Sequence, residues 1–86
     1  MKPATQIYSK DFDADFFKLP TAVQSQIELK IDRLGSSLDT FQHKRLTGLD
    51  GFRLRVGDYR VIYDFNLAKG AIHLLAVGHR REVYRL

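Results

Sequence analysis

The chain has 86 residues, no cysteine and a net charge of +4, with 44% hydrophobic and 12% aromatic residues. This length predicts one domain spanning residues 1–86, and the composition supplies a core that disordered chains lack. The lack of cysteine excludes a disulfide framework, a thiolate nucleophile and a cysteine-based zinc site. No stretch approaches the roughly 20 apolar residues of a membrane span, and the first residues do not resemble a signal peptide. We therefore expect a cytoplasmic protein with no membrane partner.

The positive charge is concentrated in the second half of the chain. Residues 1–43 carry a net charge of −1, whereas residues 44–86 carry +5, and seven of the nine basic residues there are arginines. The planar guanidinium matches phosphate oxygens with two parallel hydrogen bonds. The basic half indicates either a polyanionic partner or a solvated charged surface.

The first half of the chain predicts a short strand and two helices. Residues 5–8 form a strand candidate, and Ser9 follows as a helix N-cap. The apolar residues that follow at helical spacing are Phe12, Phe16 and Leu19. After Pro20, apolar residues at 23, 27, 31 and 34 predict a second helix that ends at Gly35.

The second half predicts a three-stranded antiparallel meander. FRLRV alternates apolar and charged residues, Gly57-Asp58 forms a two-residue hairpin loop, and YRVIYDF resumes the alternation. A turn over residues 66–70 leads into a last strand over residues 71–80. The expected fold is α+β, with two N-terminal helices packed on one face of a small antiparallel sheet in the order β-α-α-β-β-β.

The hairpin register predicts where the arginines lie. With Gly57-Asp58 as the loop, Arg55 lies opposite Arg60, and both share an outer face with Arg53. The residues expected on the core face are Phe52, Leu54, Val56, Tyr59, Val61 and Tyr63. On the last strand, Leu75 and Val77 are expected in the core. The residues that this places beside the arginines, as a concave basic floor, are Ala76, Gly78 and Arg80.

Opposed like charges across a sheet cost roughly a few tenths to 1 kcal/mol of stability. Four arginines that converge without counterions are typical of an anion site. The alternative is that the long side chains splay into water and cover apolar surface.

The remaining candidate residues are weaker. His43, His73 and His79 lack metal-site spacing, and His73 and His79 are expected on the core side or at a strand end. No paired carboxylates or serine triad are evident. Lys44 and Arg45 are expected to add to the basic rim. Tyr84 returns to the side of Arg80, where it stacks on a base, exchanges a proton or simply caps the core.

The stretches KRLTGLDGFRLRVGDYRVIYDF and VGHRREVY, with the order of elements, resemble the RelE/ParE superfamily of bacterial toxins, particularly its RelE branch. The resemblance covers nearly the whole chain and is most specific in the R-x-R-V-G-D-Y-R-V-I-Y hairpin. It implies a toxin of a type II toxin–antitoxin system that acts as an endoribonuclease. Such toxins cleave mRNA in the ribosomal A site without a metal or other cofactor. The implied partners are the ribosome, mRNA and a cognate antitoxin, with which the toxin forms a hetero-oligomer.

The resemblance also implies the site residues. The implied catalytic residues are Arg53, Arg55, Arg60, Arg80 and Tyr84, and the implied RNA-binding residues are Lys44, Arg45 and Arg81. Arg60 and Arg80 are assigned to phosphate and transition-state binding, Arg53 and Arg55 to positioning and charge, and Tyr84 to stacking and proton transfer. A guanidinium is almost never neutral, so we expect the general base to come partly from the RNA or the ribosome.

Two other functions are compatible with the sequence. The ParE branch shares the fold and acts on DNA gyrase, generally without this basic cluster. A non-catalytic RNA-binding module would use the basic face only to bind phosphates.

Overall fold

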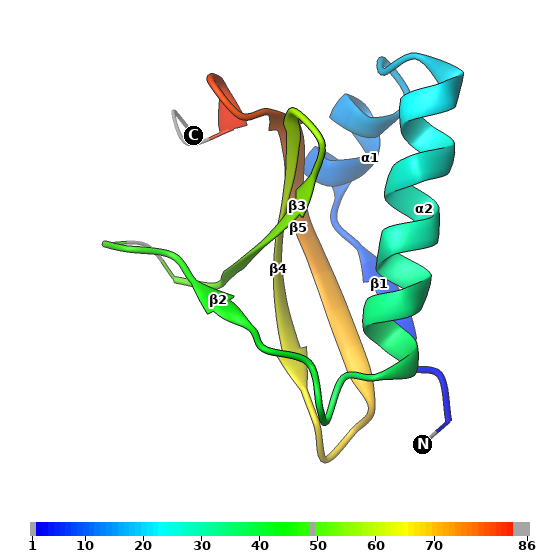
Figure 1. Ribbon diagram of the computed structural model, residues 1–86, viewed down its shortest axis with the longest axis vertical. Coiled ribbons are helices and arrows are strands. Elements are labelled where there is room, and N and C mark those ends of the chain that lie inside the picture. The colour runs from blue at the N-terminus through cyan, green and yellow to red at the C-terminus, as the bar shows by residue number, and fades with distance from the viewer. Residues whose placement is uncertain (1, 49, 84–86) are drawn as a thin grey trace.

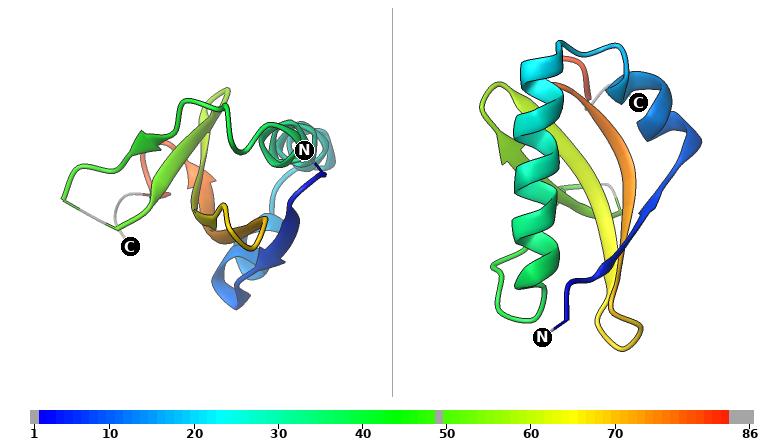
Figure 2. Two further views of the ribbon diagram at one scale, coloured as in Figure 1. Left: turned by 90° about the horizontal axis from the view of Figure 1, so that it is seen from below. Right: turned by 90° about the vertical axis from the view of Figure 1, so that its right-hand side faces the viewer.

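The computed structural model describes residues 2–48 and 50–83. Two helices pack against one face of a five-stranded mixed sheet (Figure 1), which confirms the α+β class. The elements are β1 (Thr5–Tyr8), α1 (Lys10–Phe16), α2 (Thr21–Ser36), β2 (Lys44–Arg45), β3 (Phe52–Val56), β4 (Tyr59–Asn66) and β5 (Ala71–His79). Figure 2 shows α2 running along the sheet. Neither helix of the described part is long and apolar enough to cross a membrane.

The strand order is β1-β5-β4-β3-β2. The meander of β3, β4 and β5 is antiparallel, as predicted. The prediction of a wholly antiparallel sheet is wrong at one edge, because β1 pairs in parallel with β5. Both helices and three other strands separate β1 from β5 in the chain, so no short hairpin fixes the direction of β1 relative to β5. The two-residue β2 at the other edge is too short to produce an alternation pattern, and the sequence did not predict it.

Ser9 caps α1 as predicted. Its Oγ accepts the backbone N–H of Phe12 at 3.0 Å and donates to the carbonyl of Leu75 at 2.8 Å, which ties the helix start to β5. The prediction that Gly35 ends the second helix is wrong by one residue, because α2 continues to Ser36. Gly35 is buried against the sheet, and a Cβ there would lie 3.5 Å from a side-chain carbon of Ile72, which is an ordinary van der Waals contact.

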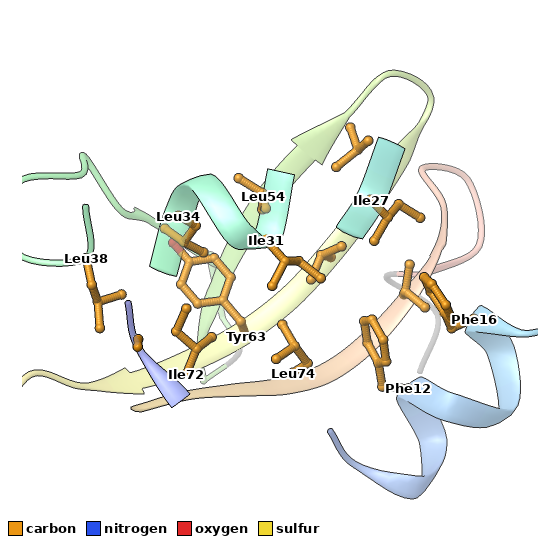
Figure 3. Close-up of a cluster of buried hydrophobic side chains, with 14 residues drawn as sticks. Phe12, Phe16, Ile27, Ile31, Leu34, Leu38, Leu54, Tyr63, Ile72 and Leu74 are labelled. Atoms are coloured by element: carbon orange, nitrogen blue, oxygen red, sulfur yellow. The ribbon is translucent and has the colours of Figure 1, made fainter. Parts of the chain in front are cut away.

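The main core lies between the helices and the sheet (Figure 3). Both helices and the three longer strands contribute fully or almost fully buried side chains, which include Phe12, Ile27, Ile31, Leu34, Leu54, Tyr63, Ile72 and Leu74. Each such aliphatic or aromatic side chain contributes about 1.5–3 kcal/mol through burial. This core stabilises a chain that has no disulfide.

An irregularity in β5 changes which residues face the core. The partner of Ile62 is Ala76, but the partner of Tyr63 is Leu74, so Leu75 is an extra residue in the β4–β5 ladder. Leu74 is fully buried, whereas Leu75 is 38% exposed. The prediction that Leu75 faces the core is therefore wrong, while the prediction for Val77 is confirmed.

Candidate nucleic-acid interface

The β3–β4 hairpin has the predicted register. Gly57 has a φ of +59° and Asp58 a negative φ, so only the first loop residue is left-handed, as in a type II′ turn. Arg55 pairs directly with Arg60, and Arg53 pairs with Ile62. The side chains of Arg53 and Arg55 are exposed and that of Arg60 is half-buried. The turn therefore places two arginine residues directly opposite each other on the outer face.

Backbone contacts hold Arg60 and Arg80 at the hairpin turn. One guanidinium nitrogen of Arg60 donates to the carbonyls of Gly57 and Tyr59, each at 2.9 Å. The N–H of Arg80 donates to the carbonyl of Asp58 at 2.8 Å, and its Nε lies 4.0 Å from the Asp58 carboxylate. An exposed ion pair of this length contributes little to stability. The backbone hydrogen bond is therefore the contact that fixes the end of β5 beside the turn. Sequence reasoning missed this role of Asp58, which has no signal beyond its place in a turn.

The outer face contains two parallel rows of residues. One row runs from Arg55 through Arg60 to Gly78, and the other runs through Lys44, Arg53, Ile62 and Ala76. Ala76 and Gly78 thus lie on the arginine side, as predicted. The arrangement groups Lys44 with Arg53, and Arg55 with Arg60.

The floor beside the arginines carries apolar side chains in addition to the predicted small residues Ala76 and Gly78. A second hydrophobic cluster covers part of the outer face and consists of Leu46, Ile62, Ala76 and Val83. Val83 lies over Gly78, since a Cβ on Gly78 would be 3.6 Å from Val83, so the segment after β5 folds back onto the sheet. This return depends on contacts distant in sequence, which alternation along one strand cannot reveal. Tyr84, the predicted stacking residue, lies outside the described residues.

The other predicted RNA-binding residues are more scattered. Arg45 pairs with Phe52, a residue of the core face, and its guanidinium carbon lies 4.8 Å from the Phe52 ring centroid. The structure therefore does not bring Arg45 together with the outer-face arginines. Arg81 is exposed, and its backbone N–H donates to Nδ1 of His79 at 3.3 Å.

His43 is a packing residue. Its Nε2 bonds the carbonyl of Leu38 at 2.9 Å and its Nδ1 bonds the hydroxyl of Tyr63 at 2.7 Å, so the neutral ring donates to the first and accepts from the second. The ring stacks on Phe65 with centroids 3.9 Å apart. Burial raises the pKa of Tyr63 above its usual range. This contact joins the α2–β2 connection to the centre of the sheet.

The other two histidines differ in position. His79 lies at the end of β5 with its ring at an edge-on angle to Tyr59, as predicted for a strand end. His73 pairs with Asp64 in the β4–β5 ladder and is half-buried. Its neighbours along the strand, Ile72 and Leu74, both face the core, so the side chain of His73 lies on the opposite face. The extra residue in β5 reverses the expected parity, so the assignment of His73 to the core side is wrong. In residues 2–48 and 50–83, no cluster of three histidine or acidic residues is arranged to hold a metal ion.

The class of protein follows from a family match over nearly the whole chain: a small toxin of a type II toxin–antitoxin system. Residues 7–84 match the family model described as ParE toxin of type II toxin-antitoxin system, parDE. The chain therefore belongs to the ParE toxin family, and its predicted membership of the RelE/ParE superfamily is confirmed. A search of curated proteins found no significant match.

Solved structures show the same fold. A chain of the toxin–antitoxin complex RelBE2 from Mycobacterium tuberculosis has a TM-score of 0.78 and 24% identity, covering 95% of this chain and 97% of that one. A chain of the RelE–RelB complex from Pyrococcus horikoshii has a TM-score of 0.74 and 26% identity, with coverage of 94% and 99%. The isolated RelE toxin of Escherichia coli has a TM-score of 0.74 and 19% identity, with coverage of 88% and 83%. This protein thus has the fold of RelE toxins.

Proposed function

We propose that this protein is a ribosome-dependent endoribonuclease that cleaves mRNA in the A site and stops translation. The observation that carries the proposal is the hairpin geometry. Arg55 and Arg60 oppose each other, and the end of β5 brings Arg80 to the same turn. A sheet built only for stability gains nothing from this arrangement, whereas a phosphate would be held by it.

The arginines of the site can perform one of the three tasks that RNA cleavage requires, and they are poorly suited to another. Cleavage requires deprotonation of a 2′-hydroxyl, stabilisation of the charge on five-coordinate phosphorus, and a proton for the departing 5′-oxygen. We assign the second task to Arg60 and Arg80, and the positioning of the RNA to Arg53 and Arg55. Arginine is a poor base, so the RNA or the ribosome would supply part of the first task, and Tyr84 is our candidate for stacking and proton transfer.

Inhibition of DNA gyrase is the second candidate function, because the family model that matches the chain is the one named for ParE. Both candidates predict neutralisation by a cognate antitoxin. The similar chains in the RelBE2 and RelE–RelB structures come from toxin–antitoxin complexes, which supports a hetero-oligomer here as well.

Brief expression of the toxin without antitoxin tests the proposal. We expect protein synthesis to stop within minutes and new mRNA 5′ ends to appear at codons occupied by ribosomes. Intact mRNA with gyrase-dependent DNA breaks would instead select the ParE activity. Binding of ribosomes without cleavage would indicate a non-catalytic RNA-binding module.

A further inference from the structure

We propose that the groove between α2 and the edge of β3 binds an RNA backbone and extends the hairpin site toward α2. The groove has a volume of about 330 Å³. Five of the side chains that line it are basic: Lys30, Arg33, Lys44, Arg53 and Arg55. The inference rests on the proposed function in one respect, namely that the polyanion is RNA.

The charge in this groove is uncompensated. None of the residues that line it is acidic. Within residues 2–48 and 50–83, the ion pair that forms is between Arg80 and Asp58, outside the groove. Five cations that share a groove without a carboxylate repel one another, and an extended polyanion relieves that repulsion.

The fold brings together cations that are far apart in the sequence. Lys30 and Arg33 are three residues apart on α2 and therefore share a helix face. Arg53 and Arg55 alternate along β3, and Lys44 is the β2 partner of Arg53. The connection from α2 to β2 links the two sides of the groove (Figure 1), and it contributes Phe41 to the lining.

The groove is open along the edge of β3 because β2 has only two residues. It pairs with β3 at Phe52 and Arg53, so on the side of β3 away from β4 no strand of residues 2–48 and 50–83 pairs with Leu54 to Val56. The half-buried ring of Phe41 and the side chain of Leu54 add apolar surface among the cations. A basic groove with an aromatic side chain is the usual composition of surfaces that bind single-stranded nucleic acid.

Continuity with the hairpin favours RNA over an acidic peptide. Arg55 lines the groove and also lies opposite Arg60, so one strand of RNA can follow the groove and reach the outer-face arginines without a break. An acidic peptide could pair with the open edge of β3. Such a peptide is the competing outcome in the test below.

The test measures binding of short fluorescein-labelled oligouridine by anisotropy over a range of salt concentrations. The variant Lys30→Gln/Arg33→Gln removes two cations that have no place in the proposed chemistry. Loss of two phosphate contacts should reduce the magnitude of the slope of log K against log salt by about 1.4. The factor by which the substitutions weaken binding should therefore be about 25-fold larger at about 0.1 M salt than at about 1 M salt. The control Lys10→Gln/Lys69→Gln removes the same charge from exposed positions outside the groove and should change the slope by less than half as much.

An unchanged slope in Lys30→Gln/Arg33→Gln, or equal changes in both double variants, would overturn the proposal. An unchanged RNA slope with weakened binding of poly-L-glutamate would assign the groove to an acidic polypeptide instead. Because binding is measured without cleavage, the groove stands if the slope falls as expected even where the wild-type toxin fails to cut mRNA. That combination would reject the ribonuclease and retain the RNA-binding groove.

Discussion

The two faces of the sheet differ in composition: one is apolar and covered by the helices, and the other carries opposed arginines. The face under the helices carries a continuous apolar core, and within the described residues every buried side-chain nitrogen or oxygen has a hydrogen-bond partner. On the outer face, the described residues form a smaller buried cluster of four apolar side chains, and Arg55 lies directly opposite Arg60. The inner face therefore stabilises the fold, whereas the outer face accepts a small loss of stability in exchange for a concentration of positive charge.

The largest expected effect is on the inner face. Ile31→Ala should lower the free energy of unfolding by about 2–5 kcal/mol, because Ile31 is 1% exposed and truncation leaves a cavity. Leu29→Ala on the same helix is the matched control, since Leu29 is 51% exposed and should change stability by about 0.5 kcal/mol or less. Thermal or urea unfolding measures both. Equal losses in the two variants would mean that burial does not separate these positions.

The next effect is on the outer face and concerns activity. Arg60→Ala should reduce the single-turnover cleavage rate on ribosomes about 100-fold or more, because a donor to the transition-state phosphate is lost. Lys44→Ala should instead weaken ribosome binding and its salt dependence with little change in the saturated rate. Similar, small losses from both variants would indicate a diffuse basic surface and no defined site.

The sequence predicted the hairpin well because its signals are local. Gly57 supplies a left-handed residue, and the alternation on either side of the turn fixes the pairing of Arg55 with Arg60. The second helix was predicted to within one residue, since the spacing of its buried residues is also a local pattern.

Features that depend on distant contacts were not predicted. The extra residue at Leu75 arises in the ladder between two strands, and no periodicity along β5 reveals it. The return of Val83 to Gly78 and the approach of Lys30 to Arg53 likewise require the folded sheet. Charge counts along the chain placed the basic residues in the second half and so overlooked the contribution of α2.

The hydrogen bond between Tyr63 and His43 gives a smaller, pH-dependent effect on the inner face. Tyr63→Phe should cost about 1 kcal/mol at neutral pH, because it removes the hydroxyl that bonds Nδ1. The raised pKa of Tyr63 means that its neutral form is favoured in the folded state, so the wild type loses stability as the pH rises above about 10, where the unfolded phenol ionises. That loss approaches about 1.4 kcal/mol per pH unit and is absent in the variant.

Urea unfolding at neutral pH and at two pH values above about 10 tests this prediction. The advantage of the wild type over Tyr63→Phe should shrink and then reverse as the pH rises. Titration of lysines affects both proteins equally, so the difference between them isolates Tyr63. A constant difference across the series would show that the phenol ionises as readily in the folded protein as in the unfolded chain.

The smallest effect returns to the opposed arginines. Arg55→Gln should stabilise the free toxin by about a few tenths of a kcal/mol while lowering activity, since it removes a like-charge pair that is useful only when an anion is bound. Thermal melts at low ionic strength are the appropriate measurement, because screening by salt is weakest there. Lys69→Gln, in the β4–β5 turn, loses the same charge without an opposed partner and should leave the melting temperature nearly unchanged. A clear loss of stability in Arg55→Gln would mean that this guanidinium holds the fold through an internal partner, and Arg55 would then have to be removed from the proposed RNA-binding surface.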